Sequence, residues 1–264
     1  MTLGTRIAIV GLMHGFSHPW IIVGTDTEVG KTVVTAGILR LLARQPLKVS
    51  TIKLVQTGCS LSESTSALVA PDLEIYRQAL SSLQSPPLHE PSLQVPYCFE
   101  PACSPHLAAE LQRQTISTGN LCEIVSRELQ GGRFVLAECA GGLLVPLNSK
   151  ETTLDFLCAL PAANVLLVAD NRLGMINHTL LTLHTLDSVG IRARGIVLNN
   201  TTPVTQADRF LREDNLRTVA RFGRTEVLAE IPWIEDFDPQ TPGGWGSVDE
   251  AIKPLGPTLL SNAS

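Results

Sequence analysis

Short runs of apolar residues alternate with amphipathic stretches along most of the chain. The apolar runs are rich in Val, Leu and Ile, and most show no alternation of polar and apolar positions, as expected for strands that are covered on both faces. We expect strands over residues 20–23, 49–53, 133–138, 164–169, 195–198 and 227–231. Such strands, separated by helices, predict a mostly parallel central sheet.

The stretches between these runs carry apolar residues every three or four positions, which is the spacing of one face of a helix. This spacing covers residues 34–41, 121–129 and 176–183. An alternation of strands and helices is typical of the α/β class, in which helices cover both faces of the sheet. We therefore expect a three-layer α/β/α fold with a mostly parallel central sheet.

Length and composition favour one domain. The chain has 264 residues, of which 44% are hydrophobic, and this is enough for one large core. We assign the domain to residues 19–264 and residues 1–18 to an extension outside the core, with a candidate natural start at Met13. Residues 85–105 are rich in proline and are expected to form a long ordered loop, and the tail from residue 236 on is expected to be loop-like.

The charge balance limits the classes of partner. A formal net charge of −5 argues against a basic face that binds the phosphates of duplex nucleic acid. No apolar run approaches the roughly 18–20 residues that a membrane span needs. The six cysteines are scattered and show no C-x-x-C spacing, which predicts reduced, mostly buried thiols. We expect a cytoplasmic protein with no nucleic-acid or membrane partner.

The strongest local signal is a glycine-rich segment, G-T-D-T-E-V-G-K-T, at residues 24–32. It follows an expected strand and opens an expected helix, which is the setting of the phosphate-binding loop (P-loop) of NTPases. Backbone N–H groups and the helix N-terminus attract phosphate, Lys31 adds a full positive charge, and the hydroxyl of Thr32 can ligate Mg²⁺. Five residues separate the two glycines, one more than in the common form of the motif. The sequence predicts a P-loop NTPase-like fold that uses ATP and Mg²⁺.

Other polar residues stand at the ends of expected strands, where α/β sheets bind ligands. Glu138 ends a hydrophobic strand and is a candidate Mg²⁺ ligand; Asp72 opens an expected helix and fits either a second ligand or an ordinary acid at a helix N-terminus. Lys53 ends another strand and can neutralise charge on a transferred phosphoryl group. Asn199 and Asn200 fit either a contact with a base edge or a turn.

Seven segments between residues 20 and 233 carry recognisable motifs. They are the P-loop with its longer spacing, K-L-V-Q-T-G at 53–58, E-P-A-C-S-P-H at 100–106, E-C-A-G-G at 138–142, L-G-M-I-N-H at 173–178, L-N-N at 198–200 and E-I-P-W at 230–233. In this order the segments resemble those of the dethiobiotin synthetases. Leu54 stands where that family has proline, and Cys139 where it has glycine.

The resemblance implies an ATP-dependent ligase that makes dethiobiotin from 7,8-diaminononanoate and CO₂ in biotin biosynthesis. One amine forms a carbamate, ATP converts the carbamate into a carbamic-phosphoric anhydride, and the second amine closes the ring. The resemblance also implies a homodimer. The main alternative is a regulatory P-loop ATPase of the partition or septum-site kind, but that class has a lysine where Asp26 stands here. A binding protein with a relic P-loop would have lost Lys53 or Glu138, and both are present.

The resemblance assigns catalysis to Lys53 and Lys31 and the Mg²⁺ ion to Thr32, Asp72 and Glu138. The residues implied for the substrate are Thr57, Ser104 and Pro105 and, across the dimer interface, Gly174, Met175, Ile176 and Asn177. The residues implied for ATP and its metal are Thr27, Glu28, Val29, Gly30, Lys31, Thr32, Val33, Asp72, Glu138, Cys139, Ala140, Gly141, Asn199, Asn200, Ile231, Pro232 and Trp233.

Overall fold

The computed structural model describes residues 16–62, 67–160 and 162–261. Position 13, the candidate start, and most of the expected extension at residues 1–18 lie outside these ranges. Among the described residues, no helix combines the length and the apolar character that crossing a membrane requires.

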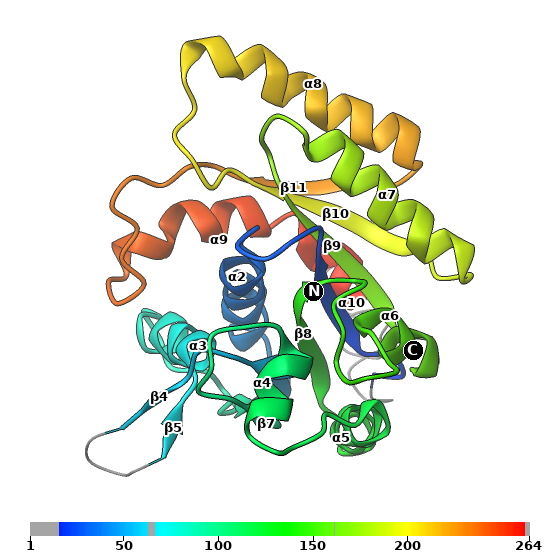
Figure 1. The fold of residues 1–264 in the computed structure, drawn as a ribbon. Helices are drawn as coiled ribbons and strands as arrows, with labels where there is room; N and C mark the ends of the chain where they lie inside the picture. The colour runs from blue at the N-terminus through cyan, green and yellow to red at the C-terminus, as the bar shows by residue number, and fades with distance from the viewer. Residues whose placement is uncertain (1–15, 63–66, 161, 262–264) are drawn as a thin grey trace.

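A parallel seven-stranded sheet forms the middle layer (Figure 1). Its strands stand in the order β11-β10-β9-β1-β8-β2-β6. Strands β1, β2 and β9 are buried along their whole length, which explains their continuous apolar runs. All six expected strands are confirmed. The strands of the sheet are β1 Trp20–Gly24, β2 Val49–Lys53, β6 Ser92–Gln94, β8 Phe134–Gly142, β9 Asn164–Asp170, β10 Ala193–Asn199 and β11 Val227–Ile231.

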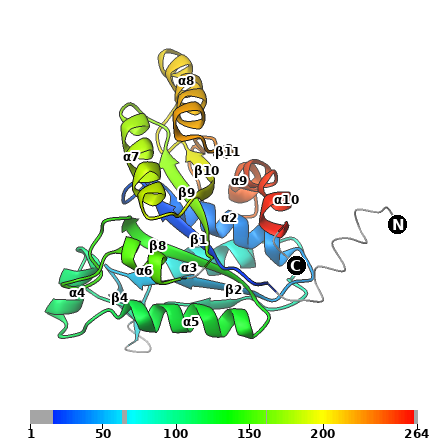
Figure 2. The ribbon, with the colours of Figure 1, turned by 90° about the vertical axis from the view of Figure 1, so that its right-hand side faces the viewer.

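Helices cover both faces of the sheet, so the predicted three-layer α/β/α fold is confirmed (Figure 2). One face packs against α2 Lys31–Ala43, α3 Pro71–Ser81, α9 Gly246–Ile252 and α10 Leu255–Leu260. The other packs against α4 Pro105–Leu111, α5 Thr118–Gln130, α6 Thr153–Ala159, α7 Met175–Ser188 and α8 Gln206–Gly223. Two small sheets pair β3 Val55–Gln56 with β7 Tyr97–Cys98, and β4 Ser60–Leu61 with β5 Leu68–Val69.

Two segments that were expected to be loops contain regular structure. The proline-rich stretch at 85–105 supplies the edge strand β6, whose three residues are too few to show a pattern, and the short strand β7. The tail folds into a 3₁₀ turn, η1 Gly243–Trp245, followed by α9 and α10. The buried residues of these two helices, Val248, Ile252, Leu255 and Leu259, recur every three or four positions. The glycines and prolines around them concealed this helical pattern.

The expectation of six reduced thiols is wrong for one pair, because Cys59 and Cys98 form a disulfide bond. The other four cysteines are free. The parallel pairing of β3 with β7 and a backbone hydrogen bond of 2.9 Å from Cys59 N–H to the carbonyl of Phe99 bring the two together. Composition could not reveal this contact, since the two residues are 39 positions apart.

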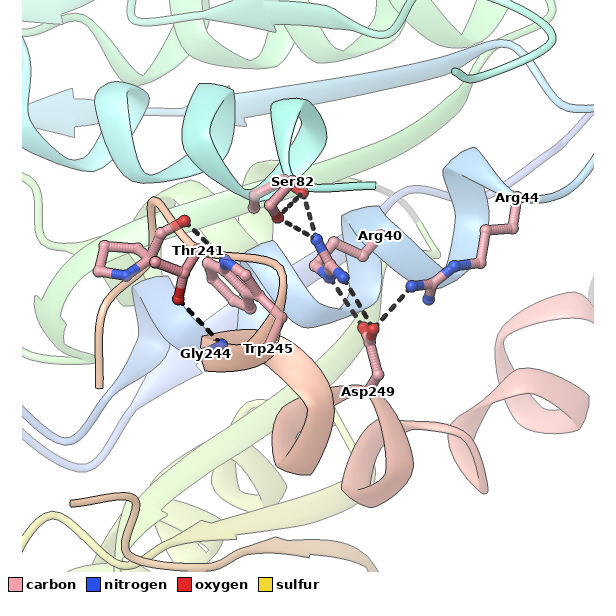
Figure 3. A network of polar contacts seen from close by, with 9 residues as sticks. Arg40, Arg44, Ser82, Thr241, Gly244, Trp245 and Asp249 are labelled. Atoms are coloured by element: carbon pink, nitrogen blue, oxygen red, sulfur yellow. Dashed lines mark hydrogen bonds and ion pairs between the residues drawn. The ribbon is translucent and has the colours of Figure 1, made fainter. Parts of the chain in front are cut away.

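A buried arginine ties three helices of one face together (Figure 3). Nε and Nη2 of Arg40 in α2 donate to the two carboxylate oxygens of Asp249 in α9, each at 2.8 Å. Its Nη1 donates to the carbonyl of Ala79 in α3 and to Oγ of Ser82, both at 2.5 Å. The guanidinium also lies over the ring of Trp245, 5.2 Å from the ring centroid. The C-terminal tail therefore braces α2 and α3 against each other.

We predict that Asp249→Asn lowers the free energy of unfolding by about 3 kcal/mol, because it leaves the buried guanidinium of Arg40 without its counter-charge. Urea unfolding measures this loss. The matched control is Glu250→Gln on the same helix, where an exposed ion pair at 3.7 Å is worth less than about 0.5 kcal/mol. Equal losses in the two variants would contradict the bracing role.

Candidate active site

The glycine-rich segment forms a loop between β1 and the N-terminus of α2, as its sequence predicts. Gly30 has a φ of 91°, and a Cβ atom there would lie 1.9 Å from Nδ2 of Asn199, so only glycine fits. Glu28 also takes a left-handed conformation, with a φ of 60°. The ammonium of Lys31 folds back over the loop and donates to the carbonyl oxygen of Asp26 at 2.6 Å. The loop thus closes around the lysine that is expected to bind phosphate.

The Lys31 ammonium lies in a poorly solvated position. Burial lowers its pKa from 10.5 to about 8, and the negative charge of Glu138 opposes this shift only in part. Near neutral pH the side chain therefore keeps its charge, but by a narrow margin. A phosphate bound beside it would favour the charged form.

Glu138 is at the centre of a buried polar cluster. The register of the parallel pair β2–β8 places Lys53 directly beside Glu138, and Lys53 Nζ lies 2.6 Å from Oε1 of Glu138. The same ammonium lies 2.5 Å from Oδ2 of Asp72 in α3. Thr32 donates its hydroxyl to Oε1 of Glu138 at 3.0 Å, and the hydroxyl of Tyr76 donates to Oε2. Four structural elements thus meet at one carboxylate that is inaccessible to solvent.

The charges in this cluster stabilise one another. Burial alone would raise the pKa of Glu138, but Lys53, the hydrogen bond from Tyr76 and the charge of Lys31 together more than offset this, so that the pKa lies below its usual value. Burial alone would lower the pKa of Lys53, but Glu138 and Asp72 hold that pKa above its usual value. Burial also raises the pKa of Tyr76, which keeps its hydroxyl protonated as a donor. The ammonium and the Glu138 carboxylate are therefore both ionised at neutral pH.

The residues expected to bind metal fit a Mg²⁺ ion that is shared with phosphate. Thr32, Asp72 and Glu138 offer one hydroxyl and two carboxylates, which are oxygen ligands of the kind that Mg²⁺ prefers. All three belong to the cluster around Lys53 and Glu138. Within the described ranges, no three or more His, Cys, Asp or Glu side chains group closely enough to hold a metal alone. An ion bound here would need further oxygens from phosphate and water.

A cavity of about 790 Å³ joins the P-loop to this cluster and to the wall formed by residues 55–57 and 102–105. Its lining includes many of the residues assigned to ATP, metal or substrate. They are Thr27, Glu28, Gly30, Lys31, Thr32, Lys53, Thr57, Asp72, Ser104, Pro105, Glu138, Ala140 and Gly141. The structure thus brings both expected catalytic lysines and part of the expected substrate wall to one hollow.

The residues expected around the base lie beside the P-loop, outside the lining of this cavity. Asn199, at the end of β10, donates from Nδ2 to the carbonyl oxygen of Val29 at 3.2 Å. Asn200 donates to the carbonyl oxygen of Ile231, at the end of β11, at 2.8 Å. Pro232 and Trp233 follow, and Trp233 is 40% exposed. The ends of β10 and β11 therefore form one edge next to the loop.

The remaining predicted residues lie in three other places. Val29 is buried in the core on the α2 side of the sheet, and Val33 packs against the same core. Cys139 belongs to the core on the opposite side, where burial raises its pKa to about 12 and keeps the thiol protonated. Residues 174–177 open α7 outside the cavity; Gly174 and Asn177 are exposed, whereas Met175 is buried. The side chain that replaces the family's glycine at 139 thus points away from the cavity.

Tyr76 is the residue of this site that sequence reasoning missed. It stands four positions after Asp72 in α3, so the two share one face of the helix. Because Asp72 was a candidate ligand, that spacing was a signal for Tyr76. Its hydroxyl supplies one of the hydrogen bonds that Glu138 needs when it is buried in the ionised state.

Comparisons with known proteins agree on a nucleotide-binding fold. Residues 19–241 match a family described as “AAA domain”. An ATP-dependent dethiobiotin synthetase BioD of Anoxybacillus flavithermus is 33% identical over 229 residues, which cover 86% of this chain and 96% of that protein. A protein of the same name from Lysinibacillus sphaericus is 37% identical over 232 residues, or 83% and 88% of the two chains.

Solved structures with a similar fold are P-loop ATPases. The MinC:MinD cell division protein complex of Aquifex aeolicus has a TM-score of 0.58 at 16% identity, over 93% of this chain and 96% of that one. A ParA family ATPase of Chlorobium tepidum has a TM-score of 0.56 at 12% identity, over 90% and 97%. At these identities the likeness shows the fold alone, and it confirms the predicted P-loop NTPase-like architecture.

We predict that nucleotide binding weakens as the pH rises through about 8. Above that pH the free protein loses the Lys31 proton, which the bound phosphate must restore, so that affinity falls by up to about tenfold per pH unit. Titration calorimetry with ATP on both sides of pH 8 measures this dependence. Lys31→Met should bind ATP weakly at every pH and show no such step. A step that persists in the variant would contradict the assignment to Lys31.

Proposed function

The chain belongs to the family of ATP-dependent dethiobiotin synthetases, and from this premise we propose how it forms dethiobiotin in biotin biosynthesis. It is a ligase that uses ATP to close a ring through carbon–nitrogen bonds. The observation that carries this conclusion is 33% identity to a relative of that name over 96% of the relative's length. The lysines and carboxylates around the cavity support the proposed steps.

The proposed reaction joins CO₂ to the two amines of 7,8-diaminononanoate. One amine attacks CO₂ and loses a proton, which gives a carbamate. A carbamate oxygen attacks the γ-phosphorus of ATP, so that a carbamic-phosphoric anhydride forms and ADP leaves. The second amine attacks the carbonyl carbon and loses a proton, the ring closes, and phosphate leaves with the carbamate oxygen. These steps require positioning and charge stabilisation more than covalent help from the protein.

We assign phosphate binding to the backbone of residues 27–33 and to the ammonium of Lys31. Lys53 lines the same cavity, and its ammonium stays protonated because carboxylates surround it. We therefore assign to Lys53 the stabilisation of negative charge on the carbamate and on the transferred phosphoryl group. Asn199, Asn200 and residues 231–233 would surround the adenine at the neighbouring edge.

We assign the Mg²⁺ ion to Thr32, Asp72 and Glu138, which supply oxygen ligands in one cluster. When bound, the ion would neutralise charge on the β- and γ-phosphates. Glu138 has a further task of its own, because its carboxylate orients both Lys53 and the Thr32 hydroxyl. Tyr76 fixes the other carboxylate oxygen and leaves Glu138 little freedom to turn.

A second copy of the chain would complete the substrate site. Thr57, Ser104 and Pro105 line the cavity and would contact the reacting part of the diamine. The exposed residues Gly174 and Asn177 lie outside the cavity of their own chain. We propose a symmetric homodimer in which the start of α7 in one subunit binds the carboxylate tail of the substrate held by the other.

The main alternative was a regulatory ATPase that acts through nucleotide-dependent dimerisation. The MinD and ParA structures match this chain only in fold, at 16% and 12% identity. Asp26 occupies the position of the lysine that such proteins are expected to carry, so that lysine is missing here. The backbone carbonyl of Asp26 accepts a hydrogen bond from Lys31. The ligase is therefore favoured.

We also propose that the protein works in the cytoplasm, where its nucleotide is available. A disulfide is uncommon in that compartment. The wall that Cys59–Cys98 closes is also held by a backbone hydrogen bond of 2.9 Å from Phe99 N–H to the carbonyl of Gln56. Reduction of the disulfide would therefore leave the β3–β7 pairing in place.

The proposed function is tested by incubating the protein with ATP, Mg²⁺, bicarbonate and 7,8-diaminononanoate. We predict one dethiobiotin, detected by mass spectrometry, for each phosphate released. Lys53→Ala should reduce product formation by about 10²- to 10³-fold, because it removes the charge that faces the transferred group. The exposed Lys48→Ala is the matched control and should retain wild-type turnover. ATP turnover that ignores the diamine, or near-normal product from Lys53→Ala, would contradict the assignment.

The shared site predicts complementation between subunits. Lys53→Ala and Asn177→Ala chains should each be nearly inactive, but a mixture that exchanges subunits should recover about one quarter of wild-type activity. Half of the dimers are then mixed, and each of these contains one intact site. The control mixes Asn177→Ala with the double variant Lys53→Ala/Asn177→Ala, which cannot rebuild a site. No recovery in the first mixture would show that residue 177 does not act across the interface.

A further inference from the structure

A buried arginine holds the segment that follows β10. Arg212 of α8 is 6% exposed, and its Nη1 donates to Oδ1 of Asn200 at 2.5 Å. Its Nη2 donates to Oγ1 of Thr202 at 3.1 Å and to the carbonyl oxygens of Thr202 and Pro203 at 3.3 and 3.2 Å. No ion pair with Arg212 occurs in the described ranges of the chain. The buried cation is therefore satisfied by neutral oxygens of one short segment.

The side-chain amide of Asn200 is fully engaged within the protein. Its Nδ2 donates to Oε1 of Glu230 at 3.0 Å and to the carbonyl oxygen of Ile231 at 2.8 Å, while its Oδ1 accepts from Arg212. An asparagine amide has two protons and one oxygen to offer, and each of these has a partner here. Asn200 is thus a link between the ends of β10 and β11 and has no free proton for a ligand.

The adjacent Asn199 differs in this respect. Its Nδ2 donates to the P-loop carbonyl of Val29, and its Oδ1 has no hydrogen bond to any residue that the structure describes. Asn199 therefore contacts the P-loop and keeps its Oδ1 available as an acceptor, whereas Asn200 is fixed by its hydrogen bond from Arg212. Asn199 and Asn200 therefore have different roles, which their hydrogen-bond partners determine.

The network extends to a third strand. Oε1 of Glu230 also accepts from Nδ2 of Asn171 at 3.1 Å, and Oδ1 of Asn171 accepts from Nδ2 of Asn215 in α8 at 3.0 Å. Figure 1 shows α8 next to α7 and above β11, at the end of the sheet where β10 and then β9 follow. The network is partly buried, since Asn171, Asn200, Arg212 and Asn215 are buried whereas Glu230 is exposed. Its buried members hold the segments that they join, because a buried polar group that loses its partner is costly.

We propose that Arg212 is a positioning residue of the nucleotide-base site. By holding Asn200 and the segment that follows, it sets the edge on which Asn199 and residues 231–233 stand. Arg212 acts through these residues and does not touch the P-loop. It therefore contributes to binding of the base and not to binding of the phosphates. This inference rests on the proposed function, because it takes that edge as the place where ATP puts its base.

The test compares two ligands that share the phosphates and differ in the base. Calorimetry with the full chain gives the dissociation constants of ATP and of inorganic tripolyphosphate. We predict that Arg212→Met weakens ATP binding by about tenfold, since it leaves the buried Oδ1 of Asn200 without its donor, and changes tripolyphosphate binding by less than about twofold. The matched control is Arg209→Met, an exposed arginine of the same helix, which should change neither.

A second variant covers the case in which Arg212→Met fails to fold. Arg212→Lys keeps a buried cation but can reach fewer of the oxygens, so it should weaken ATP binding selectively and to a smaller extent. Unchanged ATP binding in a folded variant, or equal weakening of both ligands, would overturn the positioning role. If the wild-type chain binds ATP no more tightly than tripolyphosphate, then the edge formed by β10 and β11 does not bind the base, and the inference fails while the product assay still tests the proposed function on its own.

Discussion

The candidate site depends on keeping one buried carboxylate ionised. Glu138 is inaccessible to solvent, and a charge in such a place is costly unless it is paired and hydrogen-bonded. Its partners come from three elements: Lys53 from β2, Thr32 from α2 and Tyr76 from α3. Each element must therefore keep its place for the charge to be tolerated. The same constraint holds the P-loop helix and the expected metal ligands around one cavity.

Two buried arginines secure this arrangement from opposite sides. Arg40 joins α2 and α3 to the C-terminal helix α9, and so supports the helices that carry Lys31 and Asp72. Arg212 joins α8 to the ends of β10 and β11, beside the loop. One supports the phosphate side of the site and the other the side assigned to the base. Neither guanidinium is part of the cavity lining.

The sequence alone predicts the features that rest on long hydrophobic patterns or on the polar residues at the ends of strands. The six long strands and the P-loop have strong local signals, and the meeting of Lys53 with Glu138 follows from two parallel strands that end at one edge. The edge strand β6 has three residues, too few for a pattern, and glycine and proline conceal the helices of the tail. The Cys59–Cys98 bond and the engaged amide of Asn200 depend on contacts between distant segments, which no local signal encodes.

The central claim is that the P-loop and the Lys53–Glu138 cluster act on one triphosphate. A crystal structure of the chain with a non-hydrolysable ATP analogue, Mg²⁺ and the diamine tests this directly. The account predicts a triphosphate wrapped by residues 24–32, with its terminal phosphate beside the ammonium of Lys53. A triphosphate bound elsewhere, or a Lys53 side chain turned away from it, would contradict the account.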